Sequence, residues 1–258
     1  MCIRDRYNGI NAAMQSAVQF SAPAAAGAVL TAGTLRSTLM IDVFTAILGI
    51  GLFSFVMLPK KEGGNTATSV SVNMKLGIHY VLSHKIIGKL LAVYGGFTFL
   101  CVPGGYLSGL LVSRVYGNTY WHLTAAELCG FGGMAAGGIL MSIWGGFKSR
   151  RKTLKIGLFL FGAMAIGMGL SHRFIFYLIF MMWYGIALSL VQTTITTLLQ
   201  ENVKISMQGR VFGFAGSLYC VCYPVGMVIF GLMADKIPLQ SIIVGSGIFL
   251  ILITILKD

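Results

Sequence analysis

Charge is what this sequence has least of. Only 10% of its 258 residues are charged, whereas 56% are hydrophobic and the mean hydropathy is +0.83. A soluble globular domain carries about 25% charged residues, so this composition excludes that class of protein. The few charges leave long charge-free intervals, each close to the ~20 residues that a helix needs to cross a membrane. These runs are continuously apolar, which also excludes the alternating pattern of a transmembrane β-barrel.

We therefore predict an all-α, polytopic membrane helical bundle, because a helix pairs its own backbone groups in lipid. The one long connection, residues 59–88, is predicted to be a cytoplasmic interdomain loop. Its later part is either an amphipathic helix on the membrane surface or a plain linker. The opening hexapeptide, residues 1–6, is charged, unlike the apolar segment after it, and is interpreted as a non-native scar. Eight transmembrane helices are predicted, at about residues 9–32, 38–58, 89–112, 122–144, 154–171, 174–199, 211–234 and 239–256.

The net charge of +12 does not indicate a nucleic-acid partner, because of how the cations are distributed. Of the 19 Lys and Arg residues, all but four fall on one side of the predicted membrane. The exceptions are Arg36, Arg114, Arg173 and Lys236. Positive residues in short loops stay cytoplasmic. The pattern predicts a multi-pass protein of the bacterial cytoplasmic membrane with both ends inside and the lipid bilayer as its surroundings.

Groupings typical of enzymes and metal sites are also missing from the sequence. Cys220 and Cys222 lie on different helix faces with no histidine beside them. No H-E-x-x-H pattern and no credible Ser–His pair occurs, so we expect no enzyme, no metal and no cofactor. The stretch Gly130–Ala135 matches G-x-G-x-x-A, but a dinucleotide site would need a preceding strand and a soluble helix. Gly130, Gly133 and Gly137 instead form, with Ala126, a stripe of small residues that lets helices approach closely.

Five short stretches stand out: APAAAG at 22–27, RSTLMIDVFT at 36–45, QGRVFG at 208–213, PVG at 224–226 and GLMAD at 231–235. In their order and spacing they resemble the major facilitator superfamily, in particular its macrolide-efflux-type branch. APAAAG at 22–27 is similar to the antiporter G-P-x-x-G-G of the fifth span, with alanine replacing one glycine on each side. RSTLMIDVFT at 36–45 resembles the opening of the sixth span, and QGRVFG at 208–213 resembles the start of the eleventh. PVG at 224–226 and GLMAD at 231–235 continue the similarity.

The resemblance implies spans five to twelve of a twelve-helix transporter fold, its C-terminal two-thirds. Residues 7–58 would be the last two spans of the N-terminal half and residues 89–258 the C-terminal six-helix half. The expected function is secondary active export of small amphipathic or drug-like molecules by proton antiport, with protons and the exported compound as partners. The chain by itself is expected to be truncated and inactive. Alternatives are a non-transporting eight-span interaction protein, a membrane-embedded enzyme, and a siderophore or metabolite exporter of the same superfamily.

Two acids lie well inside predicted spans, where a carboxylate is expensive and usually faces a cavity or a partner. Glu127 is a turn or two into its span and is our first candidate for proton coupling or for binding a cationic substrate. The alternatives are a neutral carboxyl bonded to a neighbouring helix, or one wetted at the outer surface. Asp42 is the second candidate, although it also fits a capping or interfacial acid near a helix N-terminus.

Aromatic and polar residues at mid-membrane depth are candidates for lining a substrate cavity between the two halves. These are Tyr94, Phe97, Tyr184, Gln192 and Thr193, although ordinary span interiors contain such residues as well.

The basic segment after residue 144 occupies the place of the family's G-x-L-A-D-R-x-G-R-R loop. Ser149 stands where the family has aspartate, so the acid-mediated gate contact is in doubt. A tight turn remains, with cations that anchor the topology and could meet helix C-termini. The candidate cytoplasmic gate residues are Gly145, Arg150, Arg151, Lys152 and Arg210.

Overall fold

The computed structural model describes residues 35–54, 77, 80, 81, 83–117, 119–144, 146, 147 and 149–256. All regular structure in these residues is α-helical, as predicted. The chain divides into two compact units, residues 1–70 and 71–258, each with its own internal contacts. The predicted span at 9–32 and most of the predicted loop at 59–88 lie outside the described residues.

The first unit is described at one helix, α2 (Leu35–Ser54). Its side chains from Leu39 to Leu52 are apolar almost throughout, and all of them are exposed within the unit. A helix that is apolar all round belongs in a large core or in a membrane.

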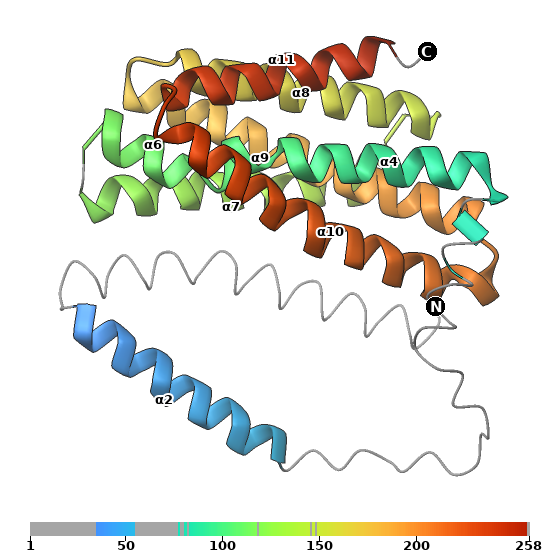
Figure 1. Cartoon of the computed structure of the whole chain (residues 1–258), viewed down its shortest axis with the longest axis horizontal. Helices are drawn as coiled ribbons and strands as arrows, with labels where there is room; N and C mark the ends of the chain where they lie inside the picture. The colour runs from blue at the N-terminus through green and yellow to red at the C-terminus, as the bar shows by residue number, and fades with distance from the viewer. Residues whose placement is uncertain are drawn as a thin grey trace. The chain divides into compact units, whose positions relative to one another are not determined.

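The second unit is a bundle of helices joined by short connections (Figure 1). The most extensive contacts pair α7 with α9, α8 with α11, and α8 with α9, while α10 packs mainly on α4. In Figure 1, α8 and α11 lie side by side and α10 crosses obliquely in front of the bundle. The helices are α4 (Lys85–Leu100), α5 (Val102–Gly105), α6 (Ser108–Val115), α7 (Tyr120–Trp144), α8 (Arg150–Leu170), α9 (Phe174–Asn202), α10 (Ile205–Ala234) and α11 (Leu239–Leu256).

The span predicted at 89–112 as one helix is interrupted in the structure. It consists of α4, α5 and α6, with breaks at Cys101 and at Tyr106–Leu107. Pro103 lies in the first turn of α5, where its missing N–H costs least. The carbonyl of Cys101 accepts hydrogen bonds from the Gly105 N–H and from the Tyr184 hydroxyl, at 2.9 and 3.0 Å. The break is therefore held in place by α9.

Five segments in the described part are long and apolar enough to cross a membrane: Lys85–Val115, Tyr120–Met141, Arg150–Leu170, Phe174–Asn202 and Met207–Ala234. Two shorter apolar helices, Leu39–Leu52 and Leu239–Ile255, coincide with two further predicted spans. The length criterion thus supports a multi-pass helical bundle and leaves the predicted total of eight spans open.

Candidate functional site

Glycines determine how closely α7 and α9 pack. A Cβ atom added at Gly133 would meet the backbone carbonyl of Met182, and one at Gly137 would lie 2.8 Å from the carbonyl oxygen of Ile186. From the other helix, a Cβ at Gly185 would meet the carbonyl oxygen of Gly130. Backbone atoms cannot rotate away, so only glycine fits these positions. The prediction that Gly130, Gly133 and Gly137 let helices approach closely is confirmed.

The same contacts show that α7 and α9 run in the same direction. Gly130 lies against Met181, and Gly137 lies further along both helices against Ile186 and Ser189. Because the two helices are parallel, residue numbers along α7 and α9 can be used to compare the depths of the candidate residues in the bundle.

Glu127 lies on α7, seven residues after the helix begins, or about 10 Å along its axis. The preceding residue, Ala126, is buried, whereas Glu127 is exposed within this unit. Among the residues that the structure describes, the Glu127 carboxylate has no hydrogen bond and no ion pair. An acid inside an apolar helix is thus open to an occupant from outside the bundle.

Gln192 and Thr193 are exposed on α9. Gly137 of α7 and Ser189 of α9 are in contact and therefore lie at the same level. Glu127 lies ten residues before Gly137, and Gln192 lies three residues after Ser189. About thirteen residues of helix therefore separate their levels, or roughly 20 Å at 1.5 Å per residue. The structure does not bring Glu127 together with this polar pair.

Phe97 and Tyr184 lie in the packed core of the bundle, with 2% and 3% of their surfaces exposed. Both pack against the buried ring of Phe161, with ring centroids 4.8 and 4.1 Å away. Neither side chain is accessible to a ligand in this structure.

Tyr94 is partly exposed on α4, at the level where Gly95 approaches Leu218 of α10. The neighbouring Tyr219 stacks on Tyr223 one turn further along α10, with ring centroids 5.3 Å apart and planes at 14°. Tyr219 is 41% exposed. We call Tyr94, Tyr219 and Tyr223 the tyrosine face. It presents aromatic rings and hydroxyl groups on one side of α4 and α10.

Asp42 lies in the first unit, exposed on α2. The Thr45 hydroxyl contacts the backbone carbonyls of Ile41 and Asp42, each at 3.0 Å. No ion pair of the Asp42 carboxylate is present among the described residues.

The end of the bundle where α8 begins carries Arg150, Arg151 and Lys152, and we call it the basic end. A tight turn leads into it: Gly146 has φ +82°, a left-handed conformation that favours glycine. The Phe147 N–H donates to the Thr153 hydroxyl at 3.0 Å, which fixes the turn on the first residues of α8. Gly145 lies outside the described residues.

Arg150 forms an ion pair with Glu201 in the last turn of α9, with Nε and Oε1 3.5 Å apart. Three cations in the first turn of α8 are disfavoured by the helix dipole. Glu201 offsets part of this effect and joins the start of α8 to the end of α9. Arg151 and Lys152 are exposed.

Gln208, near the start of α10, caps the end of α9. Its side-chain amide donates to the carbonyls of Gln200 and Val203, at 3.0 and 3.3 Å. Arg210 lies two residues further on, with its guanidinium 3.2 Å from the sulfur of Met207 and its Cβ against Gly77. The predicted gate residue Arg150 thus contacts α9, whereas Arg210 contacts Met207 of its own helix and Gly77.

Comparison with known proteins identifies the family. The family profile described as Major Facilitator Superfamily matches residues 3–227. This chain belongs to the major facilitator superfamily. Macrolide efflux protein A of Streptococcus pyogenes is 26% identical over 253 residues, covering 96% of this chain and 62% of the relative. Macrolide efflux protein A of Enterococcus faecalis is 25% identical over 225 residues, covering 85% of this chain and 69% of the relative.

The chain spans about 62% of the length of the Streptococcus protein that it matches. Membership in the superfamily confirms the resemblance that the sequence motifs indicated. It also agrees with the membrane-spanning lengths of the described helices.

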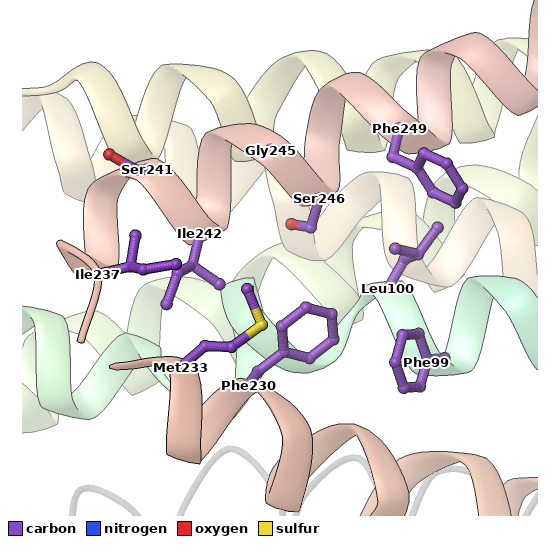
Figure 2. Close-up of a pocket in the computed structure, with 10 residues that line it drawn as sticks. All are labelled: Phe99, Leu100, Phe230, Met233, Ile237, Ser241, Ile242, Gly245, Ser246 and Phe249. Atoms are coloured by element: carbon purple, nitrogen blue, oxygen red, sulfur yellow. The ribbon is translucent and has the colours of Figure 1, made fainter. Parts of the chain in front are cut away.

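The structure also contains an apolar groove of about 390 Å³ between α10 and α11, with Phe99 and Leu100 of α4 at its edge (Figure 2). Ser241 and Ser246 contribute the only side-chain hydroxyls to its lining. The Ser246 hydroxyl donates to the Ile243 carbonyl at 2.8 Å and is thus already satisfied. None of the predicted cavity residues lines this groove, so it is separate from the tyrosine face.

Sequence reasoning missed four residues that the structure brings to these positions. Glu201 and Gln208 complete the basic end, and Tyr219 and Tyr223 complete the tyrosine face. The spacing of the two tyrosines, four residues apart on a helix, is a detectable signal. The pairing of Arg150 with Glu201 joins segments fifty residues apart and leaves no local signal.

Proposed function

We propose that this chain forms part of a secondary active transporter that exports small amphipathic molecules, macrolide-like compounds among them, by proton antiport. Its membership in the major facilitator superfamily supports the transporter class. The names of the Streptococcus and Enterococcus relatives support export and the substrate class. The protein would reside in the bacterial cytoplasmic membrane with both ends inside.

The observation that carries the coupling proposal is the Glu127 carboxylate. It lies within a span, exposed, and without an ion pair in the described part of the chain. A carboxylate in a membrane segment is costly, and such residues usually mark an ion or substrate pathway. In the proposed cycle, Glu127 takes up a proton from one side and releases it after the access of the site has changed. Asp42 remains a second candidate for this role.

Substrate would bind to the tyrosine face and to Gln192 and Thr193, which together offer aromatic surface and a few polar groups. In this proposal Phe97 and Tyr184 do not touch the substrate, because both are buried, and they contribute to the packed core of the bundle. Access would alternate by rocking of two halves around the site.

The basic end would form the gate on the cytoplasmic side. The contacts of Arg150 with Glu201 and of Gln208 with the end of α9 hold three helices together there. Arg151, Lys152 and Arg210 would anchor this end at the lipid headgroups. Gly145 remains a gate candidate outside the described residues.

The test uses everted membrane vesicles containing the protein expressed from its complete gene. Erythromycin is added to acidified vesicles, and proton release is followed with a pH-sensitive dye. We expect Glu127→Gln to abolish erythromycin-dependent proton release while radiolabelled erythromycin still binds. Glu127→Asp keeps a titratable group and should retain part of the release.

Asp235→Asn is the matched control, since it removes another carboxylate of the same bundle that lies outside the proposed gate and substrate site. It should leave the ratio of protons released to erythromycin transported unchanged. If Glu127→Gln releases protons as the unaltered protein does, Glu127 is not the coupling group.

A further inference from the structure

A second groove lies at the opposite end of the bundle from the basic end, where α8 ends and α9 begins. Its volume is about 480 Å³. We call it the α8–α9 groove, and it is lined by Gly167, Leu170, Ser171, His172, Arg173, Phe176 and Phe180. None of these residues belongs to the candidate transport site.

The walls of the groove are apolar and open to the outside of the bundle. Leu170 is 63% exposed and Phe176 is 53% exposed. At the floor, a Cβ on Gly167 would lie 2.7 Å from the ring of Phe180, so this glycine lets the ring pack closely against α8. Phe180 lies six residues into α9, so the groove extends about 9 Å from the start of the helix.

The mouth of the groove is cationic. Arg173 is exposed at the residue preceding α9, and His172 lies next to it. Among the described residues Arg173 forms no ion pair, and the first turn of α9 contains no acid. The described acids of this unit other than Glu127 are already paired: Asp235 with Arg114 and Glu201 with Arg150. Arg173 is therefore an exposed cation at the rim of the apolar α8–α9 groove.

We propose that the α8–α9 groove is a binding site for an anionic phospholipid of the surrounding membrane. Arg173 binds the phosphate, because a guanidinium matches phosphate oxygens with two parallel hydrogen bonds. One acyl chain descends along Leu170, Phe176 and Phe180. Basic pockets between transmembrane helices bind lipid headgroups at the cytoplasmic face of membranes, and this groove combines a cation with apolar walls at the other face. Free phosphate would use the cation and leave the apolar walls bare, so a lipid accounts for both features.

The headgroup is tested by native mass spectrometry of the detergent-purified chain, titrated with phosphatidylglycerol or with phosphatidylcholine. We expect phosphatidylglycerol to bind about fivefold more tightly, and Arg173→Gln to remove that preference, because one surface cation attracts anionic lipid by about that factor. Arg173→Lys should keep most of it. Lys236→Gln removes an exposed cation that does not line the groove and has no role in the proposed gate, and it should leave binding unchanged.

The acyl chain is tested by two neighbouring substitutions on exposed positions of α9. Phe176→Ser removes part of the groove wall and should weaken phosphatidylglycerol binding about fivefold, from the loss of apolar contact. Ile175 is 71% exposed and does not line the groove, so Ile175→Ser should have no effect.

Three results would overturn the proposal. The first is equal binding of the two lipids to the unaltered chain. The second is an equal loss of binding in Arg173→Gln and Lys236→Gln, which would indicate charge alone. The third is full displacement of the lipid by inorganic phosphate together with no effect of Phe176→Ser, which would indicate a simple anion site.

Discussion

The closest helix contact in the described bundle gives the sharpest prediction. At Gly133 a Cβ would be placed against the carbonyl oxygen and carbon of Met182 and 3.2 Å from the backbone nitrogen of Ile186. These are backbone atoms of α9, so Gly133→Ala can be accommodated only if α7 and α9 move apart. Overpacking of this kind costs about 1–3 kcal/mol.

Gly138→Ala is the matched control on the same helix. There a Cβ would lie 3.7 Å from the Ser189 hydroxyl, which is an ordinary contact. Both substitutions gain the same ~1 kcal/mol of helix propensity, so this gain cancels in their difference. We therefore expect Gly133→Ala to be about 1–3 kcal/mol less stable than Gly138→Ala.

The difference is measured by titrating the detergent-solubilised protein with sodium dodecyl sulfate and following helix content by circular dichroism. Equal free energies of unfolding for the two variants would refute the reasoning, because they would mean that α7 and α9 do not touch at Gly133.

Two further predictions concern the ends of the helices. Gln208→Ala should release the carbonyls of Gln200 and Val203, cost about 0.5–1.5 kcal/mol and speed hydrogen exchange at the end of α9; unchanged exchange there would contradict the cap. At the opposite end, the Tyr116 hydroxyl donates to the Ser171 carbonyl at 2.6 Å. Burial raises the pKa of Tyr116, although the Ser171 hydroxyl, 2.8 Å away, opposes this shift. Its contribution to stability should be complete below about pH 10 and be lost as pH rises through the raised pKa, so Tyr116→Phe should flatten the fall in melting temperature with pH in that range.

The positions of the helices follow from the sequence because the membrane imposes a length on every apolar run. The run between Arg173 and Glu201 predicted a helix at 174–199, and α9 spans Phe174–Asn202. The break at Cys101 was missed, although Pro103-Gly104-Gly105 signals it locally. Average apolarity is unaffected by one proline, so a hydropathy argument alone does not detect the interruption.

The candidate site was less predictable, because sequence gives the depth of a residue but not the helix face that is exposed. Phe97 and Tyr94 are three residues apart and equally aromatic, yet the first is buried and the second is open. What separates them is the presence of Phe161 on one side, which only the packing of α8 determines. The role of Glu127 stays a prediction that the geometry supports through its exposure.

The backbone contact between α7 and α9 has a mechanical consequence. Side chains between two helices can rotate and absorb a displacement. Where a glycine packs directly against a backbone carbonyl, no side chain lies between the helices to do so. A displacement of α7 near Glu127 would therefore move α9 as well, including Gln192, which lies roughly 20 Å further along. The two helices would then behave as one stiff rod, with an acid near one end and a polar pair further down its length.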